Sequence, residues 1–218
     1  MPAIAAPAQK ARNQMYEELI LDTAESIFAK MGVEQCQVKD VASAAGVSLS
    51  TQYKYFSSKE DLLRAVHARR LHVLMQLIIE TVEPQSDPLA EMLSANAAYL
   101  RFHMNYPTYL AMHLREGVAW FESENFRCQE QRDALEEGIM RASSSFARGA
   151  KKGLFVKDPP LLMARAAVAA NQVHLSHWMA EGMADSKALV IRRAHSHFIR
   201  AFCLPEKVAS LLAARLVG

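Results

Sequence analysis

The chain has 218 residues, 51% of them hydrophobic, and a formal net charge of +2, which excludes an intrinsically disordered protein. The sequence has no apolar run near the ~20 residues that a transmembrane helix needs, and residues 1–14 lack the apolar core of a signal peptide, so we expect a cytoplasmic protein without membrane contact. Residues 1–70 carry nine Lys and Arg against eight Asp and Glu, which argues against a nonspecific DNA-coating protein.

The three cysteines are Cys36, Cys128 and Cys203. They are far apart and odd in number, and no CxxC or Cys/His cluster occurs. We therefore expect neither a disulfide framework nor a zinc site. Cys36 lies near the first motif described below and invites an oxidation-sensor hypothesis. A partly buried structural thiol is the simpler interpretation.

The first predicted element is a helix over residues 13–30, preceded by a flexible tail over residues 1–12. Apolar residues recur along it at helical spacing, and Gly32 follows its end. These apolar positions are Leu19, Ile20, Ala24, Ile27, Phe28 and Met31.

Residues 38–56 predict two short helices joined by a tight turn. Val38, Val41 and Ala42 give the first helix an apolar face. Gly46 supplies a left-handed backbone after it, and Ser48 is placed to cap a second helix over residues 49–56. This second helix is rich in hydrogen-bonding side chains, so the pair is typical of a helix-turn-helix whose second helix enters a DNA major groove.

The rest of the chain predicts further helices and no strand. The breaks fall at Pro84, Pro88, Pro107, in the loop of residues 149–160 and at Pro205. The predicted helices are 59–82, 88–105, one opening at 107, 122–150, 160–181, 186–203 and a short terminal one. The fold class is therefore all-α.

Residues 24–63 resemble the TetR family of bacterial transcriptional regulators. The resemblance rests on the ordered stretch AESIFAKMGVEQCQVKDVASAAGVSLSTQYKYFSSKEDLL. It implies a DNA-binding helix-turn-helix domain over residues 13–58, and a helical effector-binding and dimerisation domain over residues 59–218. The later helices agree with the family only in number and length.

We expect the DNA contacts to lie on and beside the second motif helix. Lys39 is placed to bind a phosphate near a helix N-terminus, and the resemblance implies phosphate contacts for Tyr53 and Lys59. Gln52 either reads an adenine edge or lies at a polar edge of the domain core, and we favour the first. The full predicted set is Lys39, Ser48, Leu49, Ser50, Thr51, Gln52, Tyr53, Lys54, Tyr55 and Lys59, with Ser50, Lys54 and Tyr55 as the best base readers.

Three positions depart from the usual family motif. Cys36 and Gln37 stand where a Ser or Thr cap is usual, which predicts a weak N-terminal cap. Ser50 replaces a common Gly, and Gln52 replaces an aliphatic residue. These departures change the operator that is read rather than the ability to bind DNA.

The second part of the chain is rich in methionine and aromatic residues. Each alone is more often ordinary core, but as a group they suit an apolar ligand cavity. We expect a small apolar or aromatic effector, with contacts from Tyr99, Phe102, His103, Tyr109, Met112, His113, Trp120, Asn171, Gln172 and His177. No residue pattern indicates a cofactor or a bound metal, because His pairs such as His174 and His177 are frequent in helices without metal.

The resemblance also implies a homodimer formed by the two helices near residues 160–203. The predicted interface residues are Ala164, Ala167, Val168, Asn171, Leu175, Ile191, Ala194, His195, Phe198 and Phe202. These side chains equally suit the protein's own core. The sequence contains no nucleophile elbow, phosphate loop or paired-carboxylate motif, so we expect no enzyme. The leading hypothesis is a repressor released from a palindromic operator by its effector, and the alternative is a DNA-binding protein without a small-molecule effector that acts through protein partners or DNA architecture.

Overall fold

The computed structural model describes residues 5–81 and 87–214. These residues form α-helices, one short 3₁₀ helix and connecting loops, with an isolated bridge between Phe155 and Cys203, so the all-α prediction is confirmed. The elements are α1 (Ala5–Met31), α2 (Val38–Ala44), α3 (Leu49–Tyr55), α4 (Lys59–Thr81), α5 (Pro88–Asn105), α6 (Pro107–Arg115), η1 (Ser123–Asn125), α7 (Gln129–Lys151), α8 (Pro160–Ala180), α9 (Lys187–Phe202) and α10 (Pro205–Ala214).

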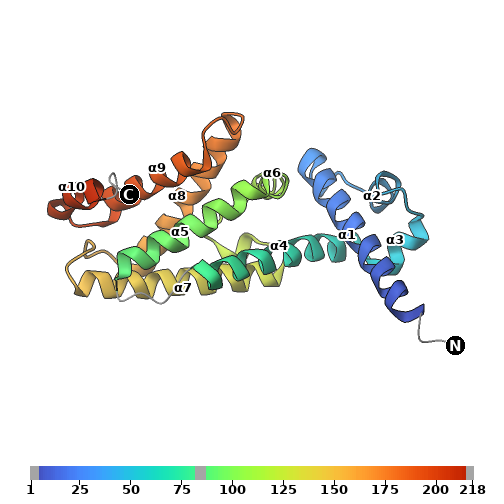
Figure 1. Cartoon of the computed structure of the whole chain (residues 1–218), viewed down its shortest axis with the longest axis horizontal. Helices are drawn as coiled ribbons and strands as arrows, with labels where there is room; N and C mark the ends of the chain where they lie inside the picture. The colour runs from blue at the N-terminus through green and yellow to red at the C-terminus, as the bar shows by residue number, and fades with distance from the viewer. Residues whose placement is uncertain (1–4, 82–86, 215–218) are drawn as a thin grey trace.

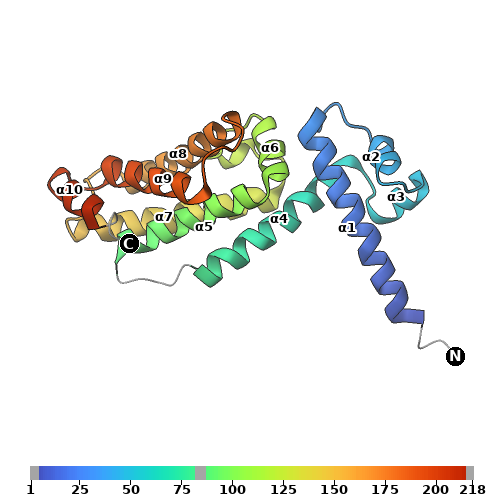
Figure 2. The same cartoon turned by 45° about the horizontal axis from the view of Figure 1, so that its top comes forward.

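The helices gather at two ends of an elongated molecule (Figure 1). Helices α1–α3 form one end, which we call the head (residues 5–56). Helices α5–α10 form the other, which we call the body (residues 88–214). Helix α4 runs from the head along the body, and α6 lies against α1 in both views (Figure 2). The head is therefore attached to the body through α4 and through the contact of α1 with α6.

Two element boundaries differ from the predicted ones. Helix α1 begins at Ala5, so residues 5–12 are helical and the predicted tail of residues 1–12 is wrong over that range; residues 1–4 lie outside the described residues. Helix α7 begins at Gln129 rather than near Glu122, because η1 and a short loop precede it. The break predicted at Pro84 also lies outside the described residues.

The hydrophobic core of the head continues into the body. Ile20, Phe28 and Leu62 lie in the same buried cluster as Phe102 and Met112. Two further clusters fill the body between α5, α7, α8 and α9. Burial of this apolar surface supplies the main stabilisation of the fold. It also makes α4 part of the core at both ends.

One close approach fixes the end of α7 against the following loop. A Cβ atom on Gly149 would lie 2.3 Å from the ring of Phe155, far inside van der Waals contact. Phe155 is fully buried, and it packs edge-on against Phe146 of α7. Only glycine at position 149 allows this packing.

Candidate functional site

Helix α3 presents a polar and partly apolar outer face on a rigid support. Gly46 adopts a positive φ of 67° in the turn before it, and Ser48 caps it by accepting a hydrogen bond from the Thr51 N–H at 3.0 Å. Leu49 is 44% exposed and Tyr53 49% exposed, and Ser50 and Lys54 are also exposed. Ser50, Tyr53 and Lys54 can therefore form hydrogen bonds with a macromolecular surface, and Leu49 can make apolar contacts with it.

The hydroxyl of Ser48 links three residues at the start of α3. It lies 2.9 Å from the Ser50 hydroxyl and 2.7 Å from the Thr51 hydroxyl. These bonds hold the first turn of α3 in one arrangement. Ser48 and Thr51 are thus placed to position the helix, while Ser50 remains exposed for contact.

The prediction that Gln52 reads a base is wrong. Its side chain is 0% exposed and lies on the inner side of α3. Neither its Nε2 nor its Oε1 has a hydrogen-bond partner among the described residues. A residue that points into the head cannot reach a base edge, so the other interpretation, a polar group in the core, describes Gln52.

Tyr55 and Lys59 also bond within the chain. The Tyr55 hydroxyl donates to Oδ1 of Asn13 on α1 at 3.1 Å, and its half-buried ring packs near Tyr16. Lys59 Nζ donates to the carbonyl of Val33 at 2.9 Å. Tyr55 therefore has its polar atom engaged away from the outer face, which makes it a poor base reader in this arrangement. Lys59 ties the α1–α2 loop to α4.

Lys39 is exposed near the N-terminus of α2. The Asp40 carboxylate accepts a hydrogen bond from the Gln37 N–H at 2.9 Å, which partly replaces the missing Ser or Thr cap. Cys36 is buried, and burial raises the pKa of its thiol. A thiol with a raised pKa carries little reactive thiolate, so the oxidation-sensor hypothesis gains no support.

Ion pairs join the head to α4. The Arg70 guanidinium donates to both carboxylate oxygens of Glu25, at 2.7 and 2.9 Å, and Glu25 is buried. The same guanidinium lies 4.1 Å from the ring centre of Tyr106, at the junction of α5 and α6. Arg70 therefore contacts the head and the body at once.

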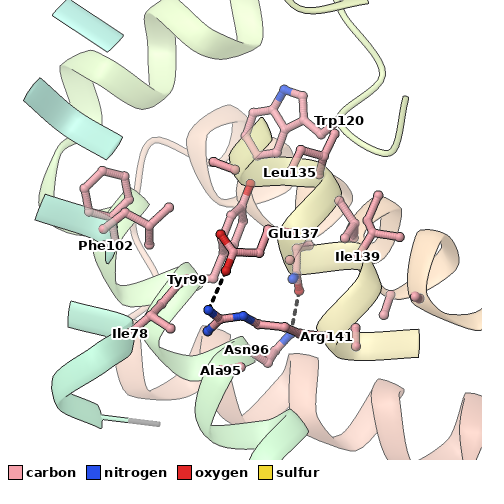
Figure 3. A pocket seen from close by; sticks show the side chains of 18 of the residues that line it. Ile78, Ala95, Asn96, Tyr99, Phe102, Trp120, Leu135, Glu137, Ile139 and Arg141 are labelled. Carbon is pink, nitrogen blue, oxygen red and sulfur yellow. Dashed lines mark hydrogen bonds and ion pairs between the residues drawn. The ribbon is translucent and has the colours of Figure 1, made fainter. Parts of the chain in front are cut away.

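The body contains a cavity of about 420 Å³ between α4, α5, α7 and α8. Figure 3 shows side chains from several of these helices converging on it. Seven residues predicted to bind a ligand line this space: Tyr99, Phe102, His103, Tyr109, His113, Trp120 and Asn171. Residues that the sequence reasoning missed include Leu74 and Ile78 on α4, Asn96 on α5, and Leu135, Ile139 and Arg141 on α7. An apolar stripe on α4 and α7 does not distinguish cavity wall from core, so the sequence carried no signal for them.

Three predicted ligand contacts are wrong. Met112 is buried in the cluster shared with the head. Gln172 accepts a hydrogen bond from the Trp120 N–H at 3.2 Å and donates to the Val118 carbonyl at 2.9 Å, so it holds the loop before η1. His177 is exposed, on the outer surface of α8. None of the three lines the cavity.

A buried polar network lies at the inner end of the cavity. His67 Nδ1 lies 3.0 Å from the Tyr109 hydroxyl, His67 Nε2 lies 3.1 Å from Glu116 Oε1, and His113 Nδ1 lies 3.0 Å from Glu116 Oε2. Neutral imidazoles that donate to an ionised Glu116, with the Tyr109 hydroxyl donating to His67, satisfy all three contacts. The network joins α4 and α6, and Tyr109 and His113 also line the cavity.

Burial and hydrogen bonding set the charges of this network. Burial raises the pKa of Glu116, but the hydrogen bonds from His113 and His67 outweigh it and hold that pKa at about 2. Burial lowers the pKa of His103 to about 3 and also lowers the pKa of His113. Burial raises the pKa of Tyr99. At neutral pH the inner end of the cavity therefore presents neutral rings around one carboxylate that is already hydrogen-bonded.

The predicted dimer residues are mostly used inside one chain. Six of them are buried in the body: Ala164, Ala167, Leu175, Ala194, Phe198 and Phe202. Val168 and Asn171 line the cavity, Ile191 packs against a core cluster, and His195 Nε2 contacts the Leu93 carbonyl. The prediction for these side chains is wrong, because the apolar face of each helix covers the body's own core.

Helix α8 carries a different set of residues on its outer surface. Leu162 is 61% exposed and Val173 is 67% exposed, and Ala166 between them is also exposed. His174 Nε2 lies 3.2 Å from His197 Nδ1 of α9 on this surface. No group of three or more His, Cys, Asp or Glu suited to a metal occurs among the described residues.

Residues 20–66, which include α2, α3 and the start of α4, match the sequence model of the bacterial regulatory proteins of the tetR family. The all-helical fold agrees with solved structures of the same type over most of the chain. The chain belongs to the TetR family. The helix-turn-helix seen in the head is thus the family's own, and relatives and family alike are regulators rather than enzymes.

Curated TetR-family relatives match only part of the chain. The chain is 35% identical over 89 residues to the transcriptional repressor LfrR of Mycolicibacterium smegmatis, covering 40% of this chain and 43% of that protein. It is 28% identical over 100 residues to the fatty acid metabolism regulator protein of Bacillus subtilis, covering 44% of this chain and 52% of that protein. The chain thus spans about half the length of the curated relatives it matches.

Solved TetR-family structures cover more of the chain. The ketosteroid transcriptional regulator KstR2 of Mycobacterium tuberculosis has a TM-score of 0.72 at 18% identity, covering 86% of this chain and 95% of that one. The fatty acid degradation regulator FadR of Bacillus halodurans has a TM-score of 0.67 at 18% identity, covering 85% and 95%. Identities this low establish the fold alone. Within the described ranges, no helix is long and apolar enough to cross a membrane.

Proposed function

We propose that this protein is a homodimeric, sequence-specific DNA-binding transcriptional regulator, and that it acts as a repressor that a small effector releases from a palindromic operator. The observation that carries the proposal is the exposed outer face of α3, held by the Ser48 cap on a buried head. An α-helix presented in this way fits a DNA major groove. The match to the TetR family and the name of the LfrR repressor support it.

The DNA-binding part comprises residues 13–58 together with the first turns of α1. Tyr53 and Lys39 hold phosphates, and Ser50, Lys54 and Leu49 contact base edges. Lys54 suits the O6 and N7 atoms of guanine, and Leu49 suits a thymine methyl group. Ser48 and Thr51 position the helix, and Gln52 and Tyr55 support it from within.

The effector-binding and dimerisation part comprises residues 59–218. The cavity of about 420 Å³ supports a small-molecule effector, because a protein without one would fill this space with side chains. The names of similar proteins point to apolar metabolites, since they include regulators of fatty acid and ketosteroid metabolism.

The effector acts through α4. Leu74 and Ile78 of α4 line the cavity, while Arg69 and Arg70 on the same helix pair with Glu25 in the head. A ligand that fits one position of α4 better than another shifts the population of head positions. Two heads held at the wrong spacing cannot enter two successive major grooves, and operator affinity falls.

The dimer forms through the outer surfaces of α8 and α9. Leu162, Ala166 and Val173 supply apolar area on α8, and small residues allow two helices to approach closely. This set replaces the buried residues that the sequence favoured.

The alternative function, a DNA-binding protein without an effector, is separated from the proposed one by a binding experiment. Fluorescence anisotropy of the protein with its own upstream intergenic DNA, across a salt series, tests the DNA half of the proposal. We expect selective binding of one or two dimers over random DNA of equal length. Binding that does not discriminate the two DNAs at any salt concentration would contradict the proposal. A screen for compounds that lower the anisotropy then tests the effector half.

A further inference from the structure

An unpaired carbonyl oxygen lies in the wall of the cavity. Asn96 Nδ2 on α5 donates to Oδ1 of Asn171 on α8 at 2.6 Å, a contact drawn as a dashed line in Figure 3. Asn96 is 9% exposed, and its Oδ1 has no hydrogen-bond partner among the described residues. A buried carbonyl without a donor is unfavourable. The cavity therefore offers an acceptor to any ligand that carries an O–H or N–H group.

The surroundings of Asn96 are apolar and aromatic. Tyr99 and Trp120 present rings to the cavity, and Ile78, Leu135 and Ile139 present aliphatic side chains (Figure 3). Aromatic rings pack favourably against flat ligands in offset or edge-on arrangements. The shape and chemistry of this wall thus favour a ring compound over a small polar one.

The charged side chains of the cavity wall are paired with one another. Arg141 bonds Glu137 at 2.5 Å, and Arg148 bonds Glu91 at 2.5 Å. Glu91 also accepts a hydrogen bond from the Ser145 hydroxyl at 2.7 Å. A charged ligand would have to break one of these pairs or remain without a counter-ion in an apolar space, and both are costly.

We propose that the effector is an uncharged ring compound with a hydroxyl group that donates a hydrogen bond to Asn96 Oδ1. The inference rests on the proposed function and specifies the ligand class of its cavity. A volume of about 420 Å³ lies within the range of small-molecule sites. The ring lies among Tyr99, Trp120 and Leu135, and the hydroxyl points to the α5–α8 amide pair.

Three naphthalene probes test this ligand class by isothermal titration calorimetry at pH 7 on the full chain without DNA. 2-Naphthol can donate a hydrogen bond, 2-methoxynaphthalene has the same ring but no donor, and 2-naphthoate is an anion. We expect 2-naphthol to bind roughly five- to tenfold more tightly than 2-methoxynaphthalene, as one added hydrogen bond to a buried acceptor gives. We expect 2-naphthoate to bind most weakly.

Substitutions then locate the acceptor. The double variant Asn96→Leu/Asn171→Leu removes both amides, and we expect it to bind 2-naphthol and 2-methoxynaphthalene equally. Asn105→Leu makes the same change on the same helix at an exposed position outside the cavity, and should keep the preference. If the double variant does not fold, the comparison of the three probes on the unmodified protein still decides the question.

Several results would overturn the inference. They are equal affinity of the unmodified protein for 2-naphthol and 2-methoxynaphthalene, tightest binding of 2-naphthoate, or no binding of any probe. Calorimetry without DNA keeps this test apart from the proposed function. Failure of operator binding would leave the ligand result standing, and failure of ligand binding would leave operator binding intact.

Discussion

His67 Nε2 lies 3.1 Å from Glu116 Oε1, so a fully buried imidazole on α4 is hydrogen-bonded to a buried carboxylate at the end of α6. The other ring nitrogen of His67 contacts Tyr109, which lines the cavity. Because α6 packs against α1, this pair of residues connects the cavity wall, the helix that leaves the head, and the helix that touches the head. We therefore expect Glu116 to matter both for stability and for the response to effector.

Glu116→Gln should lower the free energy of unfolding by about 1–3 kcal/mol at pH 7, because the amide cannot accept hydrogen bonds from both imidazoles. The pKa of Glu116 is about 2 in the folded chain, below its ordinary value near 4.5. The stabilisation is therefore complete above about pH 4.5 and is lost as pH falls toward 2.

Urea denaturation of Glu116→Gln and the unmodified protein between pH 7 and pH 3.5 measures this dependence. The stability gap should narrow below pH 4.5. Glu181→Gln removes an exposed carboxylate and serves as the control with no such change. A gap that stays constant or widens in acid would contradict the assigned charge of Glu116.

Gln52→Leu should stabilise the protein by about 1–2 kcal/mol, because it removes two buried polar atoms that lack partners and keeps similar volume. Operator preference should not change. Thermal unfolding and anisotropy on operator variants measure the two effects. Gln35→Leu, at an exposed position of the head, should stay within about 0.5 kcal/mol. Relaxed base preference in Gln52→Leu would restore the base-reading interpretation.

Lys39→Ala should weaken binding to operator and random DNA alike. Loss of one phosphate contact reduces the slope of log affinity against log salt by about 0.9. Lys54→Ala should instead lower the preference for operator over random DNA. Lys157→Ala changes an exposed lysine of the α7–α8 loop, far from the head in Figure 1, and should leave both quantities unchanged. The assigned roles fail if Lys39→Ala and Lys54→Ala give the same pattern.

Val173→Arg should convert the dimer to a monomer, because it places a charge in the apolar outer surface of α8 where the partner helix would pack. Light scattering after size exclusion should show the mass falling from twice 24.3 kDa to 24.3 kDa. Ile79→Arg introduces the same charge at an equally exposed apolar residue of α4 and should remain dimeric. A dimer that survives Val173→Arg would place the interface elsewhere.

The sequence by itself determined the helical fold and the head. Gly46, Ser48 and the apolar spacing around Val41 act through local geometry, since a left-handed turn, a hydroxyl cap and a helical face each depend on residues a few positions apart. The structure bears out Ser48 as a cap and Gly46 as a turn. The cluster of aromatic residues also predicted the region of the cavity, because Tyr99, His103 and Trp120 all line it.

Only the tertiary structure decided which face of each element points outward. Gln52 and Lys54 are two positions apart on one short helix, yet one is fully buried and the other exposed. Ala164 and Phe198 suited a dimer interface as well as a core, and packing between α5, α7, α8 and α9 placed them inside the chain. The Asn96–Asn171 pair joins residues 75 positions apart. No local pattern encodes such contacts, because they depend on how whole helices lie against one another.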